Sequence, residues 1–288
     1  MSTRYENLFS SLHERGEGAF VPFIMLGDPT PEDSLKIVRT VVAAGADALE
    51  LGVPFSDPVA DGPTIQASHL RALDGGATVD NALELISTIR TEFPELPIGM
   101  LIYGNVAFTR GFDRFYTEFA QAGADSILLP DVPVREGAPF IAAAQKADID
   151  PIFIAPARAA EETLKGVAKS SQGYIYAISR DGVTGTEKQS ETLGLEEVVS
   201  NIQRFDGPPV LLGFGISEPT HVQDAIAAGA AGAITGSAMT KIIDRQVSRE
   251  TDTDGIPLEG TPGRIDNETA LHEELTEFVS RMKAATQK

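Results

Sequence analysis

Residues 46 to 63 read Ala46-Asp-Ala-Leu-Glu-Leu-Gly-Val-Pro-Phe-Ser-Asp-Pro-Val-Ala-Asp-Gly-Pro63, and the predicted fold is organised around this stretch. Its first half is a short apolar run, as expected of a buried parallel strand, but the run contains one acid, Glu50. Its second half combines three prolines with small and acidic residues, which predicts an ordered loop. Glu50 and Asp61 can therefore meet at one end of a strand as a candidate acid–base pair.

Each acid of this stretch also has a simpler interpretation. Asp57 and Asp61 are residue types that commonly serve as turn or cap residues. Glu50 is harder to explain in this way, because an acid between Leu49 and Leu51 must be paired or protonated to be tolerated in a core.

Length and composition limit the classes of protein to consider. At 288 residues with 42% apolar content, the chain can form one large α/β domain. A net charge of −19 argues against binding to nucleic acid or to an anionic membrane, since both need a basic face. The chain has no cysteine and begins without an apolar signal core, so we expect a cytoplasmic location.

Strands and helices alternate along the chain. The junction between a helix and the next strand recurs as Ala44-Gly-Ala-Asp47, Ala122-Gly-Ala-Asp125 and Ala228-Gly-Ala-Ala231. About eight apolar runs are predicted as strands: residues 20–26, 46–51, 97–102, 126–129, 151–155, 173–178, 209–213 and 232–235. This pattern favours a (β/α)8 TIM barrel, although a doubly wound open sheet would show a similar pattern.

Two segments lie outside this repeat. Residues 3–15 have Leu8, Phe9 and Leu12 at helical spacing and predict an extra N-terminal helix. Residues 245–268 are rich in acids, glycine and proline and predict a flexible acidic insertion within the C-terminal helical region. We expect residues 1–288 to form a single domain.

Glycines follow the last two predicted strands. In a barrel these loops commonly bind phosphate, and Gly213 with Gly215, and Gly236 with Ser237, would present backbone N–H groups there. Each glycine pair alone could serve a tight turn. Together, at the two expected strand ends, they indicate a phosphate site.

The polar run at residues 179–190 has no periodicity and is interpreted as a lid over the barrel, with a plain disordered loop as the alternative. Tyr176, near the end of the preceding strand, either points into the barrel mouth or packs in the core.

Other chemistries find little support. None of the eight lysines lies on a predicted strand, as a Schiff-base aldolase requires, and the four histidines are scattered. We therefore expect no metal site and no cofactor in this chain. The reaction class that the residues still support is acid–base catalysis by carboxylates on a phosphorylated substrate.

The chain resembles the alpha subunit of tryptophan synthase. The resemblance covers nearly all of residues 1 to 245 and the last helix, and its most specific motif is Glu50-Leu-Gly-Val-Pro-Phe-Ser-Asp-Pro-Val-Ala-Asp-Gly-Pro-Thr-Ile-Gln66. Further matching segments are residues 20–29, Asp131-Val-Pro133, Ser179-Arg180, residues 182–185, Gly213-Phe-Gly-Ile-Ser217 and Gly236-Ser237. The resemblance implies a barrel that cleaves indole-3-glycerol phosphate to indole and glyceraldehyde 3-phosphate.

The resemblance also implies roles for particular residues. Glu50 matches the catalytic acid–base, Asp61 the residue that binds the indole N–H, and Tyr176 an active-site tyrosine. The matching apolar wall around indole is Phe23, Leu101, Leu128 and Phe214, and the matching phosphate cradle is Gly185, Gly213, Gly215, Gly236 and Ser237.

A partner follows from the same resemblance. The family passes indole to a beta subunit that holds pyridoxal phosphate, in an α2β2 heterotetramer. The residues that match the surface for this partner are Pro54, Asp57, Asn105, Asp131 and Pro133. The acidic insertion departs from the family, because it is longer than we expect of bacterial members.

Three alternatives remain open at this point. Indole-glycerol-phosphate synthase shares the substrate skeleton but needs strand-borne lysines. Sugar-phosphate isomerases need acids on strands 1 and 5, and here Asp28 follows the first strand but Ala155-Pro156 occupies the fifth. A regulatory subunit without activity would have little reason to retain Glu50 and Asp61.

Overall fold

The computed structural model describes residues 3–178, 194–254 and 256–287. Within these ranges, nine strands form one sheet in which each neighbouring pair is parallel. These strands are β1 (Ala19–Met25), β2 (Leu49–Gly52), β3 (Ile98–Leu101), β4 (Ser126–Leu128), β5 (Asp150–Ile152), β6 (Ile154–Pro156), β7 (Ile175–Ile178), β8 (Val210–Leu212) and β9 (Gly232–Thr235).

The sheet closes on itself because β5 and β6 are two halves of one strand. The neighbours run in the order β5-β4-β3-β2-β1-β9-β8-β7-β6, and only Phe153 separates the two end strands along the chain. Pro151 and Pro156 lie in these halves and lack the N–H that a strand ladder needs, which limits regular pairing here. Counted as one strand, they complete eight, so the predicted (β/α)8 barrel is confirmed and the open sheet is excluded.

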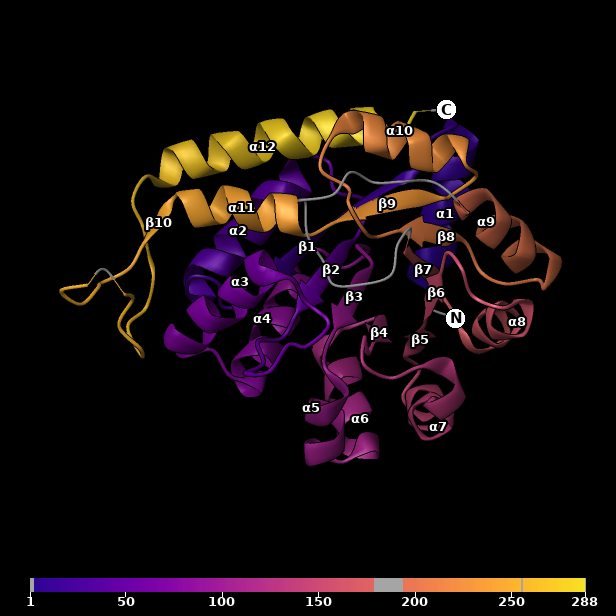
Figure 1. Cartoon of the computed structure of the whole chain (residues 1–288), viewed down its shortest axis with the longest axis horizontal. Helices are drawn as coiled ribbons and strands as arrows, with labels where there is room; N and C mark the ends of the chain where they lie inside the picture. Colours follow the sequence, from indigo (N-terminus) through magenta and orange to yellow (C-terminus); the bar gives the residue numbers. More distant parts are fainter. Residues whose placement is uncertain (1–2, 179–193, 255, 288) are drawn as a thin grey trace.

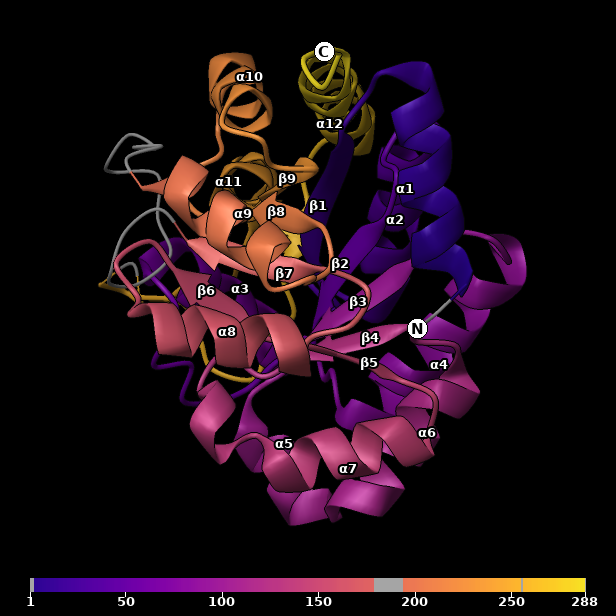
Figure 2. The same cartoon turned by 90° about the vertical axis from the view of Figure 1, so that its right-hand side faces the viewer.

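Helices surround the barrel (Figure 2). They are α1 (Thr3–Arg15), α2 (Pro31–Ala43), α3 (Pro63–Asp74), α4 (Val79–Glu92), α5 (Gly104–Arg110), α6 (Phe112–Ala122), α7 (Ala138–Lys146), α8 (Glu161–Ser170), α9 (Leu195–Arg204), α10 (Pro219–Ala227), α11 (Ser237–Arg245) and α12 (Glu268–Ala284), with a short 3-10 helix, η1 (Val134–Glu136). Every one of these helices is too short or too polar to cross a membrane, as far as the described residues go.

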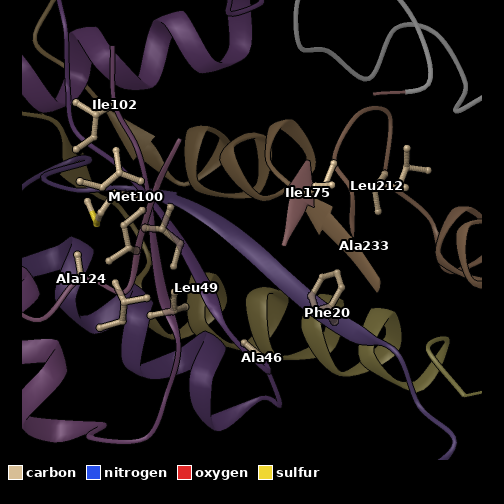
Figure 3. Close-up of a cluster of buried hydrophobic side chains, with 14 of the residues drawn as sticks. Phe20, Ala46, Leu49, Met100, Ile102, Ala124, Ile175, Leu212 and Ala233 are labelled. Atoms are coloured by element: carbon tan, nitrogen blue, oxygen red, sulfur yellow. The ribbon is translucent and has the colours of Figure 1, made fainter. Parts of the chain in front are cut away.

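Alternate residues of each strand face the helices or the barrel interior. The outward layer forms the main core, and Figure 3 shows Phe20, Leu49, Met100, Ile175 and Leu212, each on a different strand. Glu50 lies between Leu49 and Leu51, which both belong to this outward layer. The acid therefore faces the interior, which explains how β2 can carry a carboxylate.

The predicted N-terminal helix is confirmed as α1, and it packs against the barrel interior. Tyr5 and Leu12 are buried in the interior cluster, and Leu8 and Phe9 pack against it. The Tyr5 hydroxyl is 2.8 Å from Ser126 Oγ of β4. Gly99 of β3 makes this possible, because a Cβ there would lie 3.0 Å from both hydroxyls.

The acidic insertion forms a hairpin between α11 and α12. Its base is an antiparallel pair of strands, β10 (Val247–Ser248) and β11 (Arg264–Ile265), and Figure 1 shows it projecting beyond the end of α11. Asp74 at the end of α3 anchors it, by pairing with Arg249 and accepting the Gly260 N–H at 2.8 Å. That the insertion is flexible stays a prediction.

Candidate active site

Glu50 is buried at the centre of the barrel. Its side chain is only 1% exposed, and its Oε1 accepts a hydrogen bond of 3.1 Å from the Tyr174 hydroxyl of the segment before β7. Burial raises the pKa of Glu50 to about 8, against the lowering effect of this hydrogen bond, and the nearby Asp61 charge adds to the rise. Glu50 can therefore hold a proton or release it close to neutral pH.

Asp61 lies in the loop after β2, where the side chains of Tyr103 and His69 contact its carboxylate. Its Oδ2 accepts a 2.8 Å hydrogen bond from the Tyr103 hydroxyl and lies 3.2 Å from His69 Nε2. The backbone N–H of Phe55 donates to His69 Nδ1 at 2.9 Å. Since Nδ1 accepts, the ring proton is on Nε2 and points to Asp61.

Both carboxylates face one cavity at the carboxyl ends of the strands. Phe23 of β1, Leu101 of β3 and Tyr176 of β7 line it with Phe214, which follows β8. A wider cavity of about 740 Å3 adjoins it, since Asp61, Leu101, Tyr176 and Phe214 line both. Leu128 lines only the wider cavity. The volume of this wider cavity falls in the range of small-molecule sites.

Glycines form the other wall of the first cavity. Gly213, Gly215, Gly236 and Ser237 all line it, and Ser237 begins α11. No side chain of the described residues caps this helix at Gly236, so its N-terminus offers bare backbone N–H groups to the cavity, a favourable place for an anion. Gly213 has a second reason to be glycine, because a Cβ there would lie 2.0 Å from the Tyr176 ring.

Tyr176 points into the barrel mouth, which is one of its two predicted positions. It lines both cavities, and its hydroxyl donates to the Gly213 carbonyl at 3.0 Å. Burial raises the pKa of Tyr176, so its hydroxyl keeps its proton. The structure thus brings together Glu50, Asp61, Tyr176, the apolar wall and four of the five predicted phosphate residues. Gly185 and the predicted lid fall in residues 179–193, outside the described residues.

The residues predicted for a partner surface lie around the same strand ends. Asp57, Asn105, Asp131 and Pro133 are exposed, whereas Pro54 is buried. Asp131 accepts the Gly104 N–H at 2.8 Å, so it holds the start of α5, which carries Asn105.

Sequence reasoning missed three residues of the cavity wall and three side chains that contact the carboxylates: Ile65, Ile216 and Ile234, and His69, Tyr103 and Tyr174. One signal was available, because Tyr174 precedes Tyr176 by two residues and so shares its face of the strand. Ile65 and His69 are four residues apart on α3 and lie on one helix face. That this face meets Asp61 depends on the path of the loop between them.

The described residues offer little for a metal or a Schiff base. No group of three or more potential ligands among His, Cys, Asp and Glu converges in the described ranges. The six lysines that the structure describes, Lys36, Lys146, Lys165, Lys169, Lys241 and Lys283, all lie in helices rather than strands. A Schiff-base reaction is therefore not supported in this part of the chain.

The fold and the cavity together define a barrel enzyme with two buried carboxylates opposite a glycine-lined helix N-terminus. The family model described as tryptophan synthase alpha chain matches residues 9–284. The tryptophan synthase alpha chain of Corynebacterium diphtheriae is 72% identical over 284 residues, which cover 99% of both chains. The chain belongs to the tryptophan synthase alpha chain family.

Solved structures agree with this assignment. A structure of Mycobacterium tuberculosis tryptophan synthase is similar with a TM-score of 0.81 and 26% identity, covering 99% of this chain and 98% of that one. A structure of the tryptophan synthase complex from Pyrococcus furiosus has a TM-score of 0.75 and 28% identity, covering 93% and 98%.

Proposed function

We infer that this chain is a lyase that cleaves indole-3-glycerol phosphate to indole and glyceraldehyde 3-phosphate in tryptophan biosynthesis. Family membership supports this reaction. The observation that carries it at the site is the cavity that Glu50 and Asp61 share with the glycines at the start of α11. Two carboxylates at one end and an anion site at the other suit a substrate with an indole and a phosphate.

Glu50 acts as the acid and then as the base. With a pKa of about 8 it is mostly protonated at neutral pH, so it can donate a proton to indole C3. Its carboxylate then takes the proton of the glycerol hydroxyl while the carbon–carbon bond breaks and the carbonyl forms. The proton that leaves the hydroxyl replaces the one given to C3, so the residue returns to its starting state.

Asp61 binds the indole N–H and stabilises the positive charge that develops on that nitrogen when C3 is protonated. Tyr176, which contacts Gly213, positions the substrate between the two carboxylates and the phosphate-binding glycines. Phe23, Leu101, Leu128 and Phe214 form the apolar wall around the indole ring, since each lines one or both cavities. The phosphate is bound by Gly213, Gly215, Gly236 and Ser237, with Gly185 as a further candidate.

The partner is a tryptophan synthase beta subunit, expected in an α2β2 complex, and the pyridoxal phosphate belongs to that subunit. The surface proposed for it includes Asp57, Asn105, Asp131 and Pro133 at the rim of the barrel, with Pro54 beneath. Val59 and Phe108 on the same segments are 75% and 73% exposed. Large apolar side chains that are this exposed suit burial against a partner.

Three further statements belong to the proposal. The chain forms one domain over residues 1–288, it uses no cofactor of its own, and it works in the cytoplasm. The charged substrate supports the last, because a phosphate ester does not cross a lipid bilayer and must be used where it is made.

The test is the release of indole from indole-3-glycerol phosphate by the purified chain, with and without a cognate beta subunit. We expect release by the chain alone and faster release with the partner. Glu50→Gln should abolish release while folding and partner binding stay near normal. Turnover by this variant would contradict the role of Glu50, and no release by the unaltered chain under any condition would contradict the function.

A further inference from the structure

His69 is buried beside the site and uses both ring nitrogens. It is 1% exposed, and it connects two ends of one loop: Nδ1 accepts from the Phe55 backbone at 2.9 Å, and Nε2 lies 3.2 Å from Asp61 Oδ2. Phe55 opens this loop and Asp61 closes it. A histidine that only packed in the core would not need this pair of partners.

Tyr103 completes the arrangement from the other side. Its ring stacks on Phe55 with centroids 5.2 Å apart, and its hydroxyl accepts the Ala60 N–H at 3.0 Å while it donates to Asp61 Oδ2. The two donors, His69 and Tyr103, therefore converge on one oxygen of Asp61. Their direction fixes how the carboxylate is turned in the cavity that it lines.

We propose that His69 is a positioning residue for the cleavage reaction: the Phe55 N–H fixes its neutral Nε2–H tautomer, and this N–H holds the Asp61 carboxylate in the orientation that receives the indole N–H. This inference rests on the proposed function and adds to it. His69 itself does not touch the substrate. Its effect is carried entirely by the orientation of Asp61, so it should govern turnover more than substrate binding.

Two substitutions of His69 test the roles of its two ring nitrogens separately. In His69→Asn the amide oxygen can replace Nδ1 and keep the Phe55 bond, but the side chain is too short to reach Asp61. In His69→Gln the amide nitrogen can replace Nε2 and keep the bond to Asp61. His272→Asn is a matched control, because this histidine lies on α12 and bonds Thr40 instead.

The measurement is the kcat and KM of indole release for the four proteins, together with their thermal midpoints. We expect His69→Asn to lower kcat roughly ten- to a hundredfold with KM within about twofold, and His69→Gln to restore most of the loss. His272→Asn should leave both constants unchanged. In the unaltered chain, 1H–15N spectra of the imidazoles should show the Nε2–H tautomer for His69 at neutral pH.

Other results would overturn the proposal. If His69→Asn keeps full kcat, or if Asn and Gln lower kcat equally in step with their thermal midpoints, the residue has only a structural role. Spectra that show the Nδ1–H tautomer for His69 would also overturn the proposal. These results differ from failure of the proposed function, in which the unaltered chain itself releases no indole.

Discussion

Glu50 shows how a single residue can be costly to the fold and useful to the site. Its neighbours in the sequence face the helices, while Glu50 faces the barrel interior, where the Tyr174 hydroxyl donates a hydrogen bond to it. Removing a carboxylate from water by burial favours its protonated form. The same property that makes Glu50 a suitable acid should therefore be measurable as a loss of stability at high pH.

Stability should depend on pH through Glu50 in a defined window. The pKa of Glu50 rises from 4.5 to about 8 on folding, so between these values only the folded state keeps the proton. The free energy of unfolding then falls as pH rises through this window, by up to about 1.4 kcal/mol per unit, and the fall ends above the folded pKa. Glu50→Gln lacks this titration, so its stability relative to the unaltered chain should increase from pH about 5 to about 8.

Urea unfolding at a series of pH values measures this difference. Glu14→Gln is the control for the loss of one carboxylate, because Glu14 is exposed on α1. Equal slopes for the unaltered chain and Glu50→Gln would show that folding does not raise the pKa of Glu50.

At the residue scale the sequence predicts the two catalytic acids better than the side chains that position them. An acid inside an apolar strand is visible without a structure, and so are Asp61 and the glycines at strand ends. Tyr103 and His69 are not, because a tyrosine before a helix and a histidine within one have many ordinary uses. Their role depends on where the loop of residues 55–61 turns, and no local pattern specifies that path.

Among the elements, α3 contributes most to the site's support. On this one helix, Ile65 lines the cavity, His69 contacts Asp61, and Arg71 forms a buried ion pair with Asp28. Arg71 donates two hydrogen bonds of 2.8 Å to Asp28 after β1 and also pairs with Asp244 of α11. The helix thus ties the ends of the first strand and the phosphate-side helix together.

Arg71→Met should destabilise the chain by about 3–5 kcal/mol, because it leaves Asp28 buried without its cation. The side chains of Arg71 and Asp28 are 4% and 2% exposed, and burial already raises the pKa of Asp28 against the lowering effect of Arg71. The loss should therefore shrink at acid pH, where Asp28 is protonated.

Arg39→Met supplies the matched control. Arg39 also bonds a carboxylate through two nitrogens, Glu92 at 2.8 and 2.6 Å, but the two side chains are 47% and 31% exposed. We expect a loss below about 1 kcal/mol in the same urea titration. Similar losses of unfolding free energy for the two variants would mean that burial does not decide the strength of the ion pair between Arg71 and Asp28.

Element boundaries follow the sequence where local signals are strong. Thr30 caps α2 by accepting the Asp33 N–H at 3.2 Å, and Pro31 begins the helix, which are both common residue types at these positions. The second strand begins at Leu49 rather than Ala46, since Asp47 uses its side chain to accept the Phe20 N–H at 2.8 Å. The break at Phe153 depends on pairing with two different neighbours, which no window of sequence contains.

On the scale of the whole molecule, the barrel is predictable because its repeat is regular, whereas the hairpin at residues 247–265 is not. Acids, glycine and proline predicted only an irregular excursion there. Its short strands depend on Val247 pairing with Ile265, and its position depends on Asp74 of α3. Neither partner lies near enough in sequence to give a local signal.

The hairpin should be dispensable for cleavage. None of its described residues lines either site cavity, and α11, which begins with Ser237 and is about 13 Å long, lies between the hairpin and the cavity. We propose to replace residues 249–263 by an Asn-Gly turn that joins Ser248 to Arg264, which already lie on paired strands. This change removes one arginine and four acids, so the net charge goes from −19 to −16 and the chain stays acidic.

We expect the shortened chain to keep its kcat for indole release and its activation by the beta subunit. The unfolding free energy should fall by only about 1 kcal/mol, because the main bond lost is the partly exposed pair of Arg249 with Asp74, 16% and 19% exposed. Asp74→Ala in the full chain breaks the same anchor and should cost a similar amount. If the shortened chain retained cleavage but lost activation by the partner, the hairpin would belong to the partner surface, and the rim residues around Asn105 and Asp131 would not account for docking alone.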